Sequence, residues 1–126
     1  MKPERPCIYE ARTKEVYRAI MPALRYVAYQ CGYALAVHGS LKTDIDIVAC
    51  PWRESAISAE SLADKLRQTI EVIVGIARIR EGDEKPTQKP CGRLAWSFYT
   101  TPKEQEHLGP YIDLSVMPRF NTPEEK

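Results

Sequence analysis

The sequence predicts an α+β fold, in which a mixed α/β sheet carries its helices on one face. Two segments repeat apolar residues with the period of a helix, and four shorter segments have the apolar content or the alternation of strands. Glycine, proline and clusters of charge separate these segments. Their order along the chain is helix, strand, strand, helix, strand, strand, which favours one sheet covered by helices on one side.

The first helix is expected over about residues 9–30. Its apolar residues recur with the helical period at Val16, Tyr17, Ile20, Met21, Leu24 and Val27. Pro22 lies inside this stretch and predicts either a kink or two consecutive helices, because proline removes a helix hydrogen bond and collides with the preceding turn. Gly32 is expected to end the helix. The tyrosines expected to pack this helix against the sheet are Tyr9, Tyr26, Tyr29 and Tyr33.

The first two strands are expected at residues 33–37 and 44–50. The second strand opens with two alternating acids, Asp44 and Asp46. Since side chains alternate faces along a strand, both acids point the same way, with Cα atoms roughly 6.5 to 7 Å apart. The isoleucines that follow each acid point to the opposite, buried side. Pro51 is expected to stop this strand.

A second helix is expected from a cap at Ser58 or Ser61 to about Val74. Its apolar stripe, suited to packing on a sheet, consists of Leu62, Leu66, Ile70 and Ile73. Residues 81–90 are polar and contain glycine and proline, so they are expected to form an exposed loop.

The last two strands are expected at residues 93–99 and 111–117, joined by a connection over residues 100–110. Asp113 lies between apolar neighbours on the final strand. An acid in such a strand is costly unless it is paired, solvated or bound to a metal. Asp-x-Asp alone usually caps a turn or faces solvent, but a third strand acid strengthens the metal hypothesis.

A Gly39-Ser40 turn directly precedes the paired acids. Glycine has no Cβ to block a phosphate, so a backbone N–H and a hydroxyl can both approach phosphate oxygens there. Two carboxylates on one strand face can share a divalent cation. Phosphates and Mg²⁺ therefore have adjacent positions, as phosphoryl transfer on a nucleotide requires.

This set of residues resembles the signature of the nucleotidyltransferase superfamily related to DNA polymerase β, in particular its minimal bacterial members. The resemblance implies that Asp44, Asp46 and Asp113 are catalytic and bind two Mg²⁺ ions, with Mn²⁺ as an alternative. It also implies that Gly39 and Ser40 hold the triphosphate. The implied reaction moves a nucleoside monophosphate from a nucleoside triphosphate to an acceptor hydroxyl.

The wider string from His38 to Trp52 is also similar to small proteins encoded by bacteriophages and prophages. Larger superfamily members bind the base and the acceptor with an additional helical domain, which is not expected in this chain. The resemblance therefore implies that a helical partner protein, a second copy of the chain or the acceptor itself supplies that surface.

The loop before the paired acids is shorter than is usual in the superfamily, since only Leu41, Lys42 and Thr43 intervene. Lys42 could replace the missing phosphate contacts as a point charge. The short loop also keeps an alternative open, a catalytically degenerate protein of the same fold that acts as a binding partner or regulator. A metal-dependent nuclease is a third possibility, in which the Gly-Ser turn has no obvious task.

Other residues near these motifs have two readings each. His38 could donate to a phosphate, although a lone histidine at a strand end is more often structural. Trp52 could stack on a base or close the core. Arg93, Trp96 and Lys103 are further candidates for the same cleft, and Trp96 is more typical of a core.

Composition fits one compact unit. The 126 residues are expected to form a single domain, 1–126, with flexible ends at residues 1–8 and about 120–126. The formal net charge of +1 gives no global attraction to nucleic acid or to an anionic membrane. Four scattered cysteines without a C-x-x-C pair favour free thiols over a disulfide framework or a zinc site. No signal peptide or membrane-spanning run is evident, so a cytoplasmic protein of a bacterial host cell is expected.

Overall fold

A computed structural model describes residues 5–119 of the chain, with side chains from Glu10 onward. Residues 1–4 and 120–126, which hold most of the predicted flexible ends, lie outside the described residues. The first helix begins at Arg5, a few residues earlier than expected.

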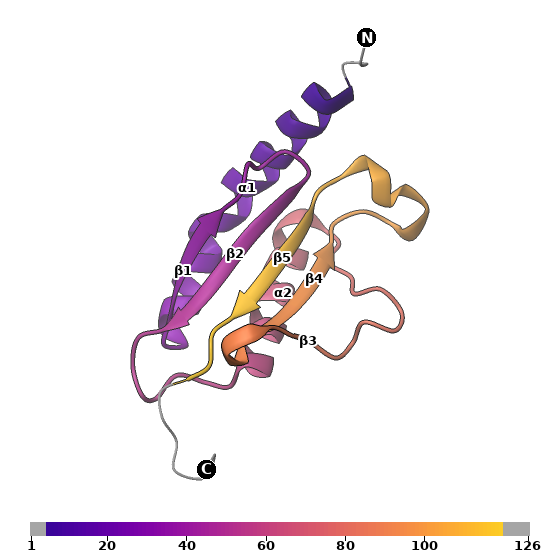
Figure 1. The fold of residues 1–126 in the computed structure, drawn as a ribbon. Helices are drawn as coiled ribbons and strands as arrows, with labels where there is room; N and C mark the ends of the chain where they lie inside the picture. The colour runs from indigo at the N-terminus through magenta and orange to yellow at the C-terminus, as the bar shows by residue number, and fades with distance from the viewer. Residues whose placement is uncertain (1–4, 120–126) are drawn as a thin grey trace.

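The architecture is a five-stranded sheet in the order β1-β2-β5-β4-β3, with α1 and α2 on one side of it (Figure 1). The strands are β1 (Tyr33–His38), β2 (Asp44–Pro51), β3 (Thr87–Gln88), β4 (Leu94–Tyr99) and β5 (Tyr111–Val116). Strands β2 and β5 pair in parallel, and every other neighbouring pair is antiparallel. The predicted α+β class and the covering of one sheet face by helices are confirmed.

The helix α1 runs unbroken from Arg5 to Gln30 and includes Pro22. The alternative of two consecutive helices was therefore wrong. Buried residues lie on both sides of the proline, with Ile20 before it and Leu24 after it. Their packing holds the helix together across the missing hydrogen bond, since tertiary contacts supply most helical stability in proteins.

The helix α2 extends from Ala59 to Val74, and Ser58 is its N-cap. The Ser58 hydroxyl accepts a hydrogen bond from the Ser61 backbone N–H at 3.2 Å, which decides between the two predicted caps. At the other end, the Gly75 N–H donates to the Glu71 carbonyl at 2.8 Å. Gly75 has a φ of 104°, a left-handed conformation that favours glycine.

The core lies between the helices and the sheet. It contains one side of each long strand and the facing stripes of both helices, including Ile20, Leu24, Ile45, Ile47, Leu66, Ile70, Trp96, Phe98, Ile112 and Leu114. Trp96 is therefore a core residue, as its alternation indicated. Tyr33 is fully buried as well, and its hydroxyl donates to the Ile57 carbonyl at 2.7 Å.

Two of the tyrosines expected to pack α1 on the sheet face solvent instead, Tyr26 at 67% and Tyr29 at 59% exposed. They lie beside the buried stripe of Leu24 and Ala28 and not within it. The side chain of Tyr9 lies outside the described side chains. Aromatic character alone was a poor guide here, because position on the helical period decides burial.

The segment predicted as an exposed loop, residues 81–90, contains the short strand β3, which pairs with β4. Two 3-10 helices also occupy predicted connections, η1 (Pro90–Gly92) and η2 (Lys103–Leu108). Of the helices in the described residues, none is long and apolar enough to cross a membrane.

Candidate metal and nucleotide site

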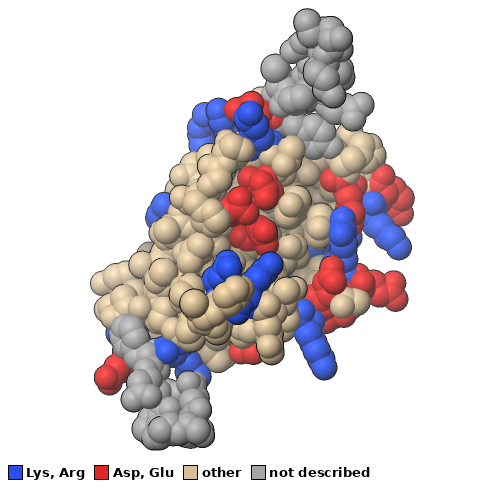
Figure 2. Space-filling view, in the orientation of Figure 1, with Lys and Arg blue, Asp and Glu red and all other residues tan. Residues whose placement is uncertain are grey.

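Three aspartates meet on the sheet face that the helices leave open. In the parallel pairing of β2 with β5, Asp46 is the partner of Asp113, and Asp44 lies two residues before Asp46. One carboxylate oxygen from each aspartate lies within 4.8 Å of the other two. Figure 2 shows an acidic group at the middle of this face, over β2 and β5. The predicted convergence of Asp44, Asp46 and Asp113 is confirmed as geometry.

The strand register that brings the acids together is fixed by the core behind them. Ile45 and Ile47 are buried on the helix side of β2, and Ile112 and Leu114 are buried on the helix side of β5. A slip of one residue would expose these side chains and bury the acids, because side chains alternate with a period of two. The hydrophobic pattern of the two strands therefore sets the position of the carboxylates.

The three carboxyl groups are half-buried and repel one another. Burial is the largest cause that raises the pKa of the Asp46 carboxyl above its ordinary value, followed by the negative charges of Asp44 and Asp113. His38, the partner of Asp46 across β1 and β2, acts in the opposite direction. A divalent cation would remove this repulsion, and three carboxylate oxygens are donors that suit Mg²⁺ or Mn²⁺.

Gly39 lies directly against Asp46. Its φ is 85°, and a Cβ added to it would lie 2.5 Å from the Oδ2 atom of Asp46. Glycine is therefore needed for two reasons, the left-handed backbone and the space taken by the carboxylate. The carboxylate occupies the space that a side chain at residue 39 would fill.

The loop between Gly39 and Asp44 is tied to α1. Its residue Leu41 also has a left-handed backbone, with a φ of 60°. The Thr13 hydroxyl, fully buried in α1, donates to the Lys42 carbonyl at 2.8 Å. The side chains of Ser40 and Lys42 are exposed at this loop. Phosphate binding by Gly39, Ser40 and Lys42 stays a prediction.

Sequence reasoning missed Ser97 on β4. Its hydroxyl donates to the Oδ1 atom of Asp113 at 3.4 Å and helps to orient that carboxylate. The two residues are cross-strand partners. The available signal was the alternation of β4, where Ser97 is a polar residue between the apolar Trp96 and Phe98.

The other candidates fall in different places. Trp52 follows Pro51 at the far end of β2 from Asp44, where it stacks on Tyr29 with ring centres 4.9 Å apart. That position keeps Trp52 away from the three aspartates, and because it is 40% exposed it does not close the core. Arg93 does reach the open face, where it donates to the Ser115 hydroxyl at 3.0 Å. Lys103 lies on η2 and is exposed.

These features define the class of site, a three-carboxylate cluster on an open sheet face beside a glycine turn. Comparison with protein-family models and with curated proteins gives no match. Among solved structures, a mutant Cid1 poly(U) polymerase bound to MgATP is similar, with a TM-score of 0.49 and 14% identity over 82% of this chain and 32% of that chain. A second Cid1 poly(U) polymerase structure has a TM-score of 0.43 and 12% identity over 90% of this chain and 37% of that one.

The chain thus spans about a third of the length of these polymerase chains, 32% and 37%. Similarity at this level concerns the path of the backbone. The chemistry has to be argued from the residues of the site itself.

Proposed function

We propose that the protein is a Mg²⁺-dependent nucleotidyltransferase, with Mn²⁺ as an alternative cation, and that it belongs to the minimal branch of the superfamily related to DNA polymerase β. The observation that carries this proposal is the gathering of three carboxylate oxygens within 4.8 Å on an open face, directly beside a glycine turn. The substrate is a nucleoside triphosphate, and the acceptor is a hydroxyl group.

Each group of the site has a role in this proposal. Asp44, Asp46 and Asp113 would together hold two divalent cations. Bound there, such cations would neutralise charge on the triphosphate and on the attacking and leaving oxygens. The Gly39 N–H and the Ser40 hydroxyl donate to the phosphates, and Lys42 adds positive charge at the rim of the loop.

In the reaction, the acceptor oxygen attacks the α-phosphorus and forms the new P–O bond. The bond between the α-phosphorus and the bridging oxygen breaks, and pyrophosphate leaves with the electron pair. The acceptor hydroxyl loses its proton to the Asp113 carboxylate. The hydrogen bond that Ser97 donates to Asp113 would help to orient the carboxylate for this role.

A second candidate function follows from the short loop. The tie between Thr13 and the Lys42 carbonyl holds the loop against α1 and limits how far it can fold over a triphosphate. A protein that has lost catalysis and acts as a binding partner or regulator would keep this arrangement. For either function we propose that the protein is cytoplasmic and is related to small proteins encoded by phages. We also propose that a helical partner protein or a second copy of the chain completes the acceptor surface.

The first prediction concerns the cation. Adding Mg²⁺ or Mn²⁺ should raise the melting temperature of the native protein, because binding relieves the repulsion within the site. At a cation concentration about a hundredfold above Kd, the gain corresponds to about 2.7 kcal/mol. Asp44→Asn combined with Asp46→Asn should remove this increase, as measured by differential scanning fluorimetry.

Its control is a double variant that removes two negative charges elsewhere, Asp64→Asn with Glu104→Gln, which should keep the full increase. An unchanged increase in the first double variant would place the cation site elsewhere.

Calorimetry with ATP and GTP in Mg²⁺ then separates the two functions. Nucleotide binding in the micromolar to millimolar range, roughly 4 to 8 kcal/mol, would support the transferase. Lys42→Ala should then weaken this binding. No binding at millimolar nucleotide would support the alternative, a binding partner or regulator without catalysis.

A further inference from the structure

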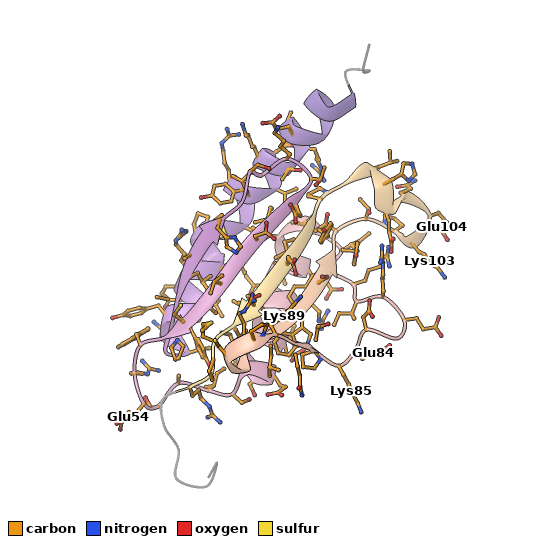
Figure 3. The ribbon with its side chains drawn as sticks, viewed as in Figure 1. Glu54, Glu84, Lys85, Lys89, Lys103 and Glu104 are labelled. Atoms are coloured by element: carbon orange, nitrogen blue, oxygen red, sulfur yellow. The ribbon has the colours of Figure 1, made fainter. Side chains whose placement is uncertain are left out.

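The two edges of the sheet are protected to different degrees. Edge strands expose unpaired backbone groups, and proteins shield them by keeping the strand short or by adding lysine and proline. The β3 edge has all of these devices, since β3 has two residues, Lys85-Pro86 lies just before it and Lys89-Pro90 follows it. Figure 3 shows Lys85 and Lys89 on the segments beside this strand.

The opposite edge, β1, has none of these devices. Its six residues, Tyr33–His38, include no lysine, acid or proline. They pair with β2 in one unbroken register, without a bulge. Figure 1 shows β1 at the margin of the sheet, and within the described residues no strand lies beyond it. A long, regular edge strand without such protection is typical of a strand that pairs with another chain.

The hydrogen bonding of β1 shows which of its backbone groups point away from β2. The Trp52 N–H donates to the Gly32 carbonyl at 2.9 Å, so these two residues are a hydrogen-bonded pair at the start of the β1–β2 ladder. Hydrogen-bonded and non-bonded pairs alternate in an antiparallel ladder. The residues of β1 that bond to β2 are therefore Ala34, Ala36 and His38.

The residues between them direct their N–H and C=O groups to the free edge, and they are Tyr33, Leu35 and Val37. The described part of the chain provides no hydrogen-bond partner for these outward groups. An extended strand laid along this edge would satisfy them.

Burial is also incomplete at this edge. On the helix side of the sheet, Ile45 and Ile47 of β2 are fully buried, at 0% and 1% exposed. Leu35 and Val37 lie on the same side of β1 and pack against the core, yet both stay partly exposed. The apolar layer therefore continues to the edge and is open there, so that further apolar side chains could extend it.

We propose that β1 pairs with β1 of a second copy of this chain, antiparallel and about a two-fold axis at Leu35. In that register Leu35 meets Leu35 of the second copy, and Tyr33 of each copy meets Val37 of the other. All of these residues point their backbone groups outward, so each facing pair can form two hydrogen bonds. The two Leu35 side chains meet on the helix side and close the open end of the apolar layer. On the other side only Ala34 and Ala36 meet, which leaves room for the close approach.

The helices favour a second copy over an unrelated strand. The helix α1 lies over β1 and β2, and its residue Val27 faces α2. Arg18 and Tyr29, both exposed, lie about 180° and 200° around the helix from Val27, on the flank above the free edge.

Arg18 and Tyr29 are separated along α1 by about 16 Å, close to the length of β1. The helix runs antiparallel to β1, and the two copies of β1 run antiparallel to each other. Arg18 of each copy is therefore level with Tyr29 of the other, where a guanidinium can lie over an aromatic ring. The exposed Arg25, on the same flank between them, is long enough to extend into solvent.

The test places charges on the exposed side of β1. In the proposed register, Ala34 of each copy lies opposite Ala36 of the other, and both alanines are exposed. Ala34→Lys with Ala36→Lys sets like charges opposite each other twice and should weaken dimerisation about tenfold. Ala34→Glu with Ala36→Lys sets opposite charges in the same places and should dimerise at least as tightly as the native protein. The two variants are matched, because they differ only at residue 34.

Sedimentation velocity of the full chain, from about 1 μM to about 1 mM protein, measures the dimerisation constant. Amide hydrogen exchange followed by NMR locates the interface. In the native protein, the N–H groups of Leu35 and Val37 should exchange more slowly as protein concentration rises. The Ala36 N–H bonds to β2 within one copy, so its exchange should not depend on concentration and serves as an internal control.

A native protein that stays monomeric up to about 1 mM would overturn the proposal. Equal dimerisation of the two variants would overturn it as well, because the copies would then meet through another surface. Since both alanines are exposed, circular dichroism of dilute samples should show that both variants fold. The experiment uses neither cation nor nucleotide, so its result is independent of the transferase proposal.

Discussion

At the scale of single residues, the contact between Gly39 and Asp46 links the turn to the carboxylates. Asp46 is the central acid, since it adjoins the turn on one side and Asp113 on the other. The sequence alone indicated that glycine leaves room for a phosphate. The structure adds that glycine leaves room for the Asp46 carboxylate, so a side chain at residue 39 displaces a ligand of the proposed cation.

We predict that Gly39→Ala removes most of the increase in melting temperature caused by Mn²⁺, because its Cβ would force the Asp46 carboxylate to move. Gly82→Ala is the matched control, since Gly82 also has a left-handed φ, 94°, but a Cβ added there would meet no atom within 4 Å. Both variants carry a backbone cost of about 1 kcal/mol. Full retention of the Mn²⁺ effect in Gly39→Ala would show that Asp46 is not a ligand.

The aspartates could be predicted from sequence because alternation is a local property of a strand. Ser97 could not be placed beside Asp113 in the same way. Alternation assigns Ser97 to the polar face of β4, but only the register between β4 and β5 sets it opposite Asp113. That register comes from pairing between strands, a contact that local periodicity does not encode.

At the scale of secondary-structure elements, α1 supports the loop of the site as well as the core. The buried Thr13 hydroxyl crosses from the helix to the Lys42 carbonyl, 29 residues further along the chain. This hydrogen bond ties the segment between β1 and β2 to α1 at the Lys42 carbonyl. The sequence did not indicate a role for Thr13, either in the site or in the apolar stripe. Its hydrogen-bond acceptor is a backbone carbonyl, which every residue has, so no sequence pattern marks the contact.

We predict that Thr13→Val, which keeps the shape but removes the hydroxyl, lowers stability by about 1 kcal/mol and speeds amide hydrogen exchange in residues 39–43. Thr69→Val is the control, because the Thr69 hydroxyl bonds only to the Lys65 carbonyl within α2. If exchange in the loop were equal in both variants, the tie to α1 would have no role in ordering the loop.

The elements themselves were predicted well wherever packing and periodicity agree. The strands that carry the aspartates and the helix α2 with its Ser58 cap follow this rule. Pro22 is an exception, because burial of its neighbours outweighs the local cost of proline. Tyr29 is another, since it stacks on Trp52 at the surface and does not reach the sheet.

At the scale of the whole molecule, two carboxylates give opposite dependences of stability on pH. Glu106 joins η2 to the segment before β3 by ion pairs with Arg78 at 2.6 Å and Arg80 at 2.9 Å. Hydrogen bonds from Arg80 and then Arg78 hold the pKa of Glu106 below its ordinary value. Its stabilising effect is therefore present above the ordinary glutamate range and is lost as pH falls through the lowered pKa.

For Asp46 the sign is reversed. The pKa of Asp46 is raised in the folded, cation-free protein, so the charged carboxylate destabilises the folded state. This destabilisation is fully present above the raised pKa and disappears once pH falls below the ordinary aspartate range. We predict that Glu106→Gln is less stable than the native protein at pH about 7 and that Asp46→Asn is more stable, with both differences shrinking toward pH about 3. Urea unfolding at the two pH values, in the presence of EDTA, measures both. A difference of the same sign in the two variants would contradict the assignment.

The strand β5 enters the sheet between two segments made before it, β2 on one side and β4 on the other. While the chain is being synthesised, the edges of β2 and β4 that pair with β5 have no partner until β5 emerges from the ribosome. Asp113 arrives with that last strand. A nascent chain can therefore present two of the acids but not the third, and its ability to retain a cation would begin only when the sheet is complete.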